Sequence, residues 1–199
     1  VVCGLGRTGK WFGYQNFEVQ PDIVTTAKGV AAGYAAISIT ATSAKVFELF
    51  KENPANPDSY FRDISTFGGC TAGPAAALKA LSIIKQEKLL ENINTVGAHL
   101  KDKLFELYDK HSSIGEVRGK GLLCGIELVK DRKTKEPLNE QIVTSVAGHC
   151  LQNKVMIGRT NRSFEKNNNV LLFSPAFIST KGDIDLIIDA VDNALTETV

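Results

Sequence analysis

The run of residues 22–33 constrains the fold most, because a strand-like segment stops there and gives way to small residues. Residues 23–26 read Ile-Val-Thr-Thr, which is typical of a β-strand, and residues 27–33 are alanine, glycine or valine except for Lys28. An ammonium group among small apolar neighbours loses hydration, which favours the neutral, nucleophilic amine. Lys28 is therefore a candidate for a covalent bond to a carbonyl group, and the alternative is a surface lysine at a strand end.

A glycine-rich segment at residues 1–10, Val-Val-Cys-Gly-Leu-Gly-Arg-Thr-Gly-Lys, contains the G-x-G-x-x-G spacing of dinucleotide-binding loops. That motif needs an amphipathic helix directly after it, whose N-terminus meets the pyrophosphate. Gly13 and Pro21 interrupt any apolar helical stripe in the following residues. The pattern therefore favours a loop in which the glycines permit tight turns.

The composition excludes several classes of partner. The 199 residues carry a net charge of +1, which gives no electrostatic basis for binding nucleic acid or an anionic membrane. No apolar run approaches the ~18 residues of a membrane span, and we expect no signal peptide. The cysteines are widely spaced without a C-x-x-C pair, so we expect small core residues of a cytoplasmic protein and no metal site. They are Cys3, Cys70, Cys124 and Cys150.

Hydrophobic patterning in the first 90 residues indicates an α/β arrangement. We expect two short buried strands at residues 23–26 and 36–40, on either side of the small-residue loop. The other elements expected here are a helix from Ser43 to Phe50, a loop at residues 53–59, and a helix opening at Pro74 with Ala75, Leu78, Leu81 and Ile84 on its apolar face.

The remaining residues combine helices with an antiparallel sheet. A long helix at 89–110 places Val96, Leu100, Leu104 and Leu107 at helical spacing. Glycines interrupt residues 114–129, which suggests a pair of antiparallel strands with glycine bends. The further expected elements are a helix at 142–151, strands at 155–157 and 170–173, and a final helix that starts with a capping box at Thr180 and Asp183 and buries Ile184, Ile187, Ile188, Val191 and Leu195.

Four segments together resemble the class III aminotransferases that depend on pyridoxal phosphate (PLP). They are Gly-Leu-Gly-Arg-Thr-Gly at 4–9, Pro-Asp-Ile at 21–23 ahead of Lys28, Ser-Thr-Phe-Gly-Gly at 65–69, and Val-Arg-Gly-Lys-Gly-Leu at 117–122. The resemblance covers essentially the whole chain and implies an α/β fold, the C-terminal part of the fold type I PLP-dependent transferases. Residues 1–90 would end the mostly parallel sheet of the large cofactor-binding domain, and residues 91–199 would form a small α+β domain with an antiparallel sheet. The N-terminal half of the enzyme would then precede Val1.

The same resemblance assigns roles at the cofactor. Lys28 would hold PLP through a Schiff base and afterwards move a proton between substrate and cofactor, which is general acid–base work. Thr66 would bind the phosphate of the cofactor in the neighbouring subunit, which implies a homodimer with sites at the interface. Val1 would pack against the ring, while the aspartate for the pyridine nitrogen would lie upstream. One departure is Cys70-Thr71, where many relatives have Asn-Pro or His-Pro.

Substrate recognition points to Arg159, at the end of Val-Met-Ile-Gly-Arg (155–159). By resemblance this arginine binds the acidic group of the substrate, and a planar fork of donors suits carboxylate or sulfonate oxygens. Arg162 is the second choice, and solvated surface is the alternative for both. Arg118 is more plausibly structural.

Among class III enzymes the chain is most similar to those that pass an amino group from taurine or another ω-amino acid to pyruvate. Val2 supports this branch, because the ornithine-type branch has glutamine there. The implied reaction converts taurine and pyruvate to sulfoacetaldehyde and alanine. The alternatives are a β-alanine–pyruvate or diamine aminotransferase, an aminomutase or decarboxylase of the same fold family, and an inactive fragment or scaffold piece.

Overall fold

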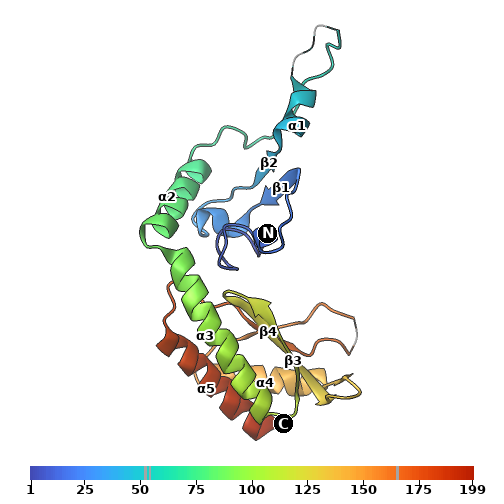
Figure 1. Ribbon diagram of the computed structural model, residues 1–199, viewed down its shortest axis with the longest axis vertical. Helices are drawn as coiled ribbons and strands as arrows, with labels where there is room; N and C mark the ends of the chain where they lie inside the picture. Colours follow the sequence, from blue (N-terminus) through green and yellow to red (C-terminus); the bar gives the residue numbers. More distant parts are fainter. Residues whose placement is uncertain (52, 54, 165) are drawn as a thin grey trace. The chain divides into compact units, whose positions relative to one another are not determined.

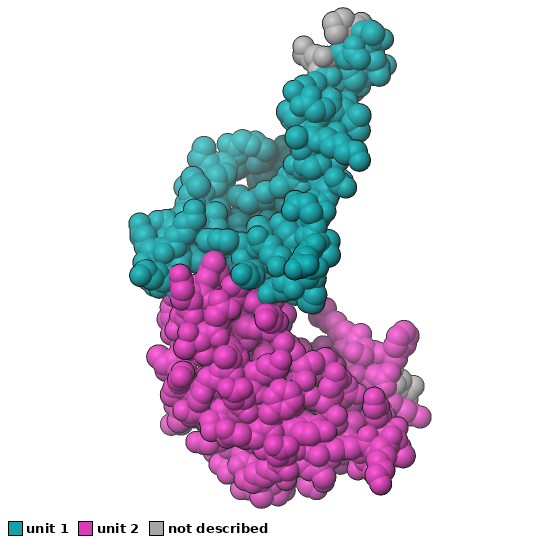
Figure 2. All heavy atoms as spheres, viewed as in Figure 1, with its two compact units in different colours: residues 1–6, 10–88 teal, residues 7–9, 89–199 magenta. Residues whose placement is uncertain are grey.

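The computed structural model describes residues 1–51, 53, 55–164 and 166–199. It contains two compact units, coloured separately in Figure 2. Unit 1 comprises residues 1–6 and 10–88, and unit 2 comprises residues 7–9 and 89–199. The division of the enzyme into domains at residue 90 stays a prediction. No helix among the described residues is long and apolar enough to cross a bilayer.

Unit 1 is built around a two-stranded antiparallel sheet. Its elements are the 3₁₀ helix η1 (Gly13–Asn16), strand β1 (Ile23–Thr26), the 3₁₀ helix η2 (Lys28–Ala31), strand β2 (Ile39–Thr42), helix α1 (Ala44–Phe47), the 3₁₀ helix η3 (Glu48–Phe50) and helix α2 (Ala72–Gln86). The register pairs Ile23 with Thr42 and Thr26 with Ile39. Helix η2 packs against α2, and Leu5, Val30 and Ala77 form a small core.

The predicted strand at 23–26 is present, but the second strand begins three residues later than expected. Ala32 and Gly33 have φ values of 50° and 83°, so a left-handed turn precedes the return of the chain. The pairing of Thr26 with Ile39 then places β2 at residues 39–42. The expectation of burial is wrong for both strands, because all four residues of β2 are exposed and only Thr26 of β1 is buried.

The apolar face predicted for the helix after Pro74 is also partly wrong. Helix α2 begins at Ala72, so Pro74 is its third residue, and it buries Gly73, Ala77 and Ile84. Ala75 and Leu78 are exposed. The reason is a close approach at Gly73, where an added Cβ would lie 3.3 Å from the Ala36 carbonyl oxygen and from Ile37 Cβ.

The helix expected at residues 43–50 forms as two consecutive pieces, α1 and η3. Ser43 occupies the N-cap position, but its hydroxyl donates to Asp22 Oδ1 at 3.1 Å instead of capping the helix. The loop expected at 53–59 includes Pro54, which lies outside the described residues.

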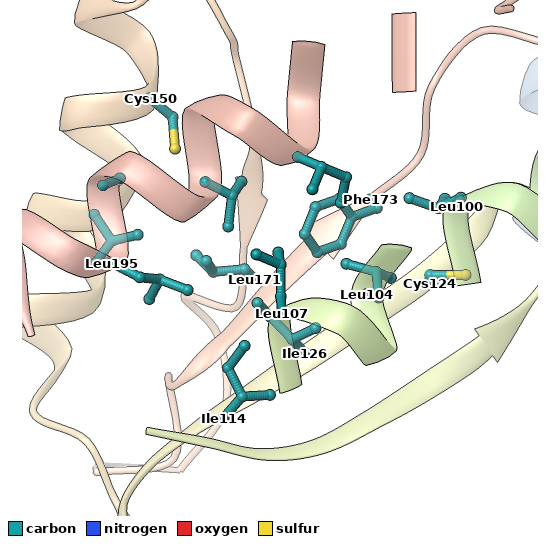
Figure 3. Packing of buried hydrophobic residues seen from close by; sticks show 14 of the residues in the cluster. Leu100, Leu104, Leu107, Ile114, Cys124, Ile126, Cys150, Leu171, Phe173 and Leu195 are labelled. Atoms are coloured by element: carbon teal, nitrogen blue, oxygen red, sulfur yellow. The ribbon is translucent and has the colours of Figure 1, made fainter. Parts of the chain in front are cut away.

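Unit 2 packs three helices on one face of an antiparallel sheet, as Figure 1 shows. The helices are α3 (Leu89–Lys110), α4 (Glu140–Gln152) and α5 (Lys181–Thr198), and the strands are β3 (Ile114–Lys120), β4 (Leu123–Asp131), β5 (Glu136–Pro137), β6 (Gly158–Arg159) and β7 (Val170–Phe173). The strand order is β3-β4-β7-β6, with β5 paired to β4. Figure 3 shows the core, where Leu100, Leu104 and Leu107 of α3 meet Ile126 and Leu171 of the sheet.

Most elements predicted for this unit are confirmed. The long helix has the predicted bounds, and its four predicted core residues are buried. The capping box of Thr180 and Asp183 is present at the start of α5. The strand predicted at 155–157 is wrong, because Val155 donates its N–H to the Cys150 carbonyl and continues the turn after α4. Strand β6 therefore pairs with β7 only at Gly158 and Arg159.

Residues 7–9 join unit 2 and explain the glycine-rich motif. The Arg7 guanidinium donates to the carbonyls of Leu122 and Pro175 and lies 4.6 Å from the Phe177 ring centroid. Burial lowers the pKa of Arg7. Gly9 has a φ of 83°, and an added Cβ would lie 2.0 Å from Asn94 Oδ1. The motif is therefore a tight loop, followed only by the four-residue helix η1, and not a dinucleotide site.

Candidate functional site

Lys28 lies two residues beyond the end of β1 and opens η2. Its φ is 55°, a left-handed conformation that costs free energy for a residue with a Cβ and that occurs preferentially at functional sites. The side chain is exposed, and it makes no hydrogen bond or ion pair with the described residues. The described residues of this chain therefore do not provide the loss of hydration expected from the small neighbours.

Open space surrounds the loop of Lys28. An added Cβ at Gly29 or Gly33 would meet no atom of the described residues within 4 Å, apart from its neighbours in the chain. Val30 and Ala31, the next residues of η2, are fully buried and anchor the loop. The loop of Lys28 is thus anchored by two buried residues and is open at Gly29 and Gly33.

Thr66 lies in a tight turn of unit 1. The N–H of Gly68 donates to the Ser65 carbonyl at 2.9 Å, and Thr66 is one of the two residues inside this turn. Its hydroxyl is exposed and has no hydrogen-bond partner among the described residues. Gly69, with a φ of 81° and no atom near its Cβ position, leaves the approach to the turn open.

Val1 is 57% exposed, and its carbonyl accepts a hydrogen bond from Gly4 N–H at 3.2 Å. No hydrogen bond or ion pair among the described residues joins Val1, Lys28 and Thr66. The roles of these three residues at one cofactor site therefore stay predictions.

An apolar cavity of about 320 Å³ lies beside the strand that leads to Lys28. Its walls include Trp11, Phe12, Val24, Val30 and Leu81. Thr26 also lines the cavity, and its hydroxyl is buried without a partner among the described residues. A buried hydroxyl without a hydrogen-bond partner is uncommon in native proteins. Sequence patterning carried no signal for it.

Arg159 lies in unit 2, at the edge strand β6. Its Nη1 donates to Glu140 Oε1 at 3.1 Å and to the Thr160 carbonyl at 3.3 Å, and its side chain is 27% exposed. Glu140 Oε2 in turn accepts from Asn168 Nδ2 at 3.1 Å. Sequence reasoning identified the arginine but missed Glu140 and Asn168, because 19 and nine residues separate them from it and neither belongs to a motif.

The other arginines considered differ clearly from Arg159. Arg118 bonds Glu127 at 2.8 Å and Glu116 at 2.6 Å, and the hydrogen bond to Glu127 is the main cause of its raised pKa. It belongs to a surface ion-pair network of the sheet. Arg162 is exposed and has no partner among the described residues.

The chain matches the class-III aminotransferase family over residues 1–195, and it belongs to that family. Its α/β architecture with antiparallel sheets is the C-terminal part of the fold type I PLP-dependent transferases, as the sequence predicted. In the described part of unit 1, however, the strands are antiparallel.

Individual relatives narrow the comparison. The chain is 59% identical over 196 residues to a taurine–pyruvate aminotransferase of Bilophila wadsworthia, covering 98% of this chain and 43% of the relative. It is 57% identical over 197 residues to a hypotaurine/taurine–pyruvate aminotransferase of Paracoccus denitrificans, covering 99% and 43%. The crystal structure of a Bacillus anthracis aminotransferase is 40% identical with a TM-score of 0.93, covering 99% of this chain and 43% of that chain. The chain thus spans less than half the length of these relatives.

The described residues fit a PLP cofactor as far as they contribute to its site. Lys28 supplies an unpaired amine, and the empty volume beside Gly29 and Gly33 leaves room for a ring. Thr66 supplies an unpaired hydroxyl next to glycines, which permits close approach to a phosphate oxygen.

Proposed function

We propose that the enzyme containing this chain transfers the amino group of taurine to pyruvate with PLP as cofactor, giving sulfoacetaldehyde and alanine. The observation that carries the proposal is the unpaired Lys28 amine on its left-handed backbone, in a chain 59% identical to a taurine–pyruvate aminotransferase. PLP, when bound, supplies the electron sink for the carbon that carries the amine.

Lys28 is the residue we assign to cofactor attachment and proton transfer. Its amine is exposed and unpaired, so neither step requires breaking an ion pair with a described residue. The buried Val30 and Ala31 anchor the backbone directly after Lys28, which limits where the side chain starts. A positioned amine of this kind is suited to general acid–base transfer at a single carbon.

Thr66 we assign to the cofactor phosphate of a second subunit, which makes the enzyme a homodimer. The segment around Thr66 supports an interface, because large apolar side chains are exposed along it. Phe61, Ile64 and Phe67 are 69%, 91% and 81% exposed. Exposed apolar side chains concentrated in one segment mark protein–protein contacts. Val1 we assign to packing against the cofactor ring.

Arg159 we assign to the sulfonate of taurine and the carboxylate of pyruvate. Only Nη1 of its guanidinium is used within the described residues, so its other donors remain for an anionic oxygen. We also propose a cytoplasmic location, because Cys3, Cys70, Cys124 and Cys150 are all free.

The substrate is tested with the complete enzyme and pyruvate, using taurine, β-alanine, putrescine and an aromatic amine as donors. We expect the highest kcat/KM for taurine, and preferred turnover of another donor would overturn the substrate. The half-reaction with the donor alone must shift the visible absorbance of the cofactor without releasing carbon dioxide. Carbon dioxide release would indicate a decarboxylase.

The role of Lys28 is tested by borohydride reduction followed by peptide mapping. We expect the cofactor on Lys28, and we expect Lys28→Ala to lose at least about 10³-fold in kcat, since it removes the activated nucleophile and base together. Lys45→Ala, at an exposed lysine of α1, is the matched control and should retain activity. Trapping at any other lysine would refute the assignment.

A further inference from the structure

Only one nitrogen of the Arg159 guanidinium makes hydrogen bonds with the described residues. Nη1 makes both of its hydrogen bonds, to Glu140 Oε1 and to the Thr160 carbonyl. Nε and Nη2 have no partner among the described residues. These two nitrogens form one edge of the planar fork, the edge that binds two oxygens of a carboxylate or sulfonate side by side.

Glu140 is itself fixed from two sides. It is the first residue of α4, where the helix dipole favours a negative charge, and the preceding Asn139 caps the helix by accepting from Gln141 N–H at 2.7 Å. Its Oε1 accepts from Arg159 and its Oε2 from Asn168. Both carboxylate oxygens are therefore committed, and the carboxylate plane has little freedom to turn.

Asn168 connects this carboxylate to the loop that follows β6. Asn168 is only 8% exposed, its Nδ2 donates to Glu140, and its Oδ1 accepts from Ser163 N–H at 3.0 Å. The start of α4, the loop after β6 and the arginine at the end of β6 are thus joined through Glu140. No other described side chain bonds the Arg159 guanidinium.

We propose that Glu140, held by Asn168, is a positioning residue for Arg159 and thereby for the acidic end of the substrate. This inference rests on the substrate role proposed for Arg159. A long, mobile side chain loses rotamer freedom when it binds a ligand, and a carboxylate that already restrains one corner removes part of that cost. Because Glu140 uses only Nη1, it leaves the Nε–Nη2 edge available and does not compete for it.

The carboxylate holds Nη1 in place and leaves the orientation of the Nε–Nη2 edge adjustable. In transamination both the donor and pyruvate must place an anionic group at one spot, although a sulfonate and a carboxylate differ in shape. An arginine restrained at one nitrogen can adjust its free edge between the two while its position is retained. A neutral-tailed amine gains nothing from this restraint, and that difference makes the idea testable.

The test uses the complete enzyme and the donor half-reaction alone, which keeps pyruvate out of the measurement. The apparent Kd and the rate constant at saturation are read from the cofactor absorbance for taurine and for benzylamine. For Glu140→Ala we expect the Kd for taurine to rise roughly three- to tenfold, with about the same Kd for benzylamine. Glu140→Gln keeps one acceptor for Arg159 but places its NH2 group against the Asn168 Nδ2 donor, so it should restore only part of the affinity. Glu136→Gln, which removes the carboxylate paired with Lys130 in the same unit, is the charge-matched control.

Three results would overturn the positioning role. They are an unchanged Kd for taurine in Glu140→Ala, a lower Kd that reveals competition by the carboxylate, or an equal loss for benzylamine that reveals general damage. Arg159→Ala separates this inference from the proposed function. If Arg159→Ala weakens taurine binding and Glu140→Ala does not, only the positioning role fails; if neither does, the substrate role of Arg159 fails with it.

Discussion

Helix α3 and the β3–β4 turn lie so close together that adding a single methyl group between them should push them apart. Gly97 is buried in α3, and a Cβ added there would lie 2.6 Å from the carbonyl carbon of Gly121 and 2.7 Å from its Cα. Gly121 cannot retreat, because its own Cβ position is 2.7 Å from the Thr8 carbonyl carbon. Three backbone segments therefore stack with no room for a side chain, and Gly97→Ala forces at least one of them to move.

The magnitude follows from two opposing terms. Alanine in a helix interior is favoured over glycine by about 1 kcal/mol. Overpacking a tight site costs about 1–3 kcal/mol, and the upper part of that range applies because the contact is with backbone. We therefore expect Gly97→Ala to lower the free energy of unfolding of unit 2 by about 1–2 kcal/mol. Gly148→Ala in α4 is the matched control, since no atom lies within 4 Å of its Cβ position, and it should stabilise by up to about 1 kcal/mol.

Native-state hydrogen exchange of the complete enzyme measures both variants locally. In Gly97→Ala, peptides from residues 89–110 and 114–131 should exchange roughly 5–30 times faster under conditions where exchange reports opening free energy. In Gly148→Ala, peptides from 140–152 should exchange at the same rate or more slowly. Equal behaviour of the two variants would show that the close contact at Gly97 is absent from the protein in solution.

Four further outcomes follow from unit 2. Burial raises the pKa of the Cys124 thiol to about 11, so this thiol should stay protonated and unreactive to disulfide reagents at pH 8 until the protein unfolds, and rapid labelling would contradict its burial. Thr180→Ala removes the cap of α5 and should cost about 1 kcal/mol by denaturant titration; an unchanged midpoint would contradict the capping geometry. Hydrogen bonds from Thr180 lower the pKa of Asp183. The ionised Asp183 should therefore add to the free energy of unfolding above the ordinary aspartate pKa, and this stabilisation should be lost as the pH falls through the lowered pKa. Stabilisation by Asp183 that persists in acid would contradict this sign. Leu100→Ala empties a fully buried site and should cost about 2–5 kcal/mol in the same titration, whereas a cost below about 1 kcal/mol would mean that the core collapses around it.

Long periodic segments were the most predictable part of the fold. Helix α3 shows the reason, because four apolar residues at helical spacing require a single buried face and leave little choice of bounds. The glycine bends of the β3–β4 pair could be predicted from the sequence equally well. Gly119 and Gly121 adopt φ values of 146° and 58°, which only glycine adopts readily.

Packing partners decided the parts that sequence did not predict. The face of α2 depends on the backbone of Ala36 at Gly73, and that contact leaves no periodic trace in the helix. The start of β2 depends on the left-handed pair Ala32 and Gly33, and alanine gives no hint of a positive φ. Local propensity cannot report contacts or strain that distant segments impose.

The candidate site residues also differ in whether the sequence or only the structure indicated them. The neighbours of Lys28 made it a candidate beside a surface lysine, and the resemblance to class III aminotransferases decided between the two; its role stays a prediction. Its left-handed backbone does not single it out, because Lys88, Lys135 and Lys154 also have positive φ values. Thr66 and Val1 came only from the resemblance, because an exposed turn threonine and an exposed valine carry no chemical signal alone. Glu140 could be identified only from the structure, because the hydrogen bond from Arg159 is what indicates its role.

The physical argument for Lys28 changes once its surroundings are known. The small neighbours of Lys28 were expected to reduce the hydration of its amine. The structure instead has open space beside Gly29 and Gly33, and the Lys28 side chain is exposed. The role that we propose for the small residues of this loop is therefore to leave room for the planar cofactor. Gly29→Val separates the two explanations in the complete enzyme. If the volume is needed for the cofactor, the added side chain should weaken PLP binding, seen as loss of cofactor absorbance after dialysis; if small size only dried the amine, the bulkier and more apolar valine should leave PLP bound.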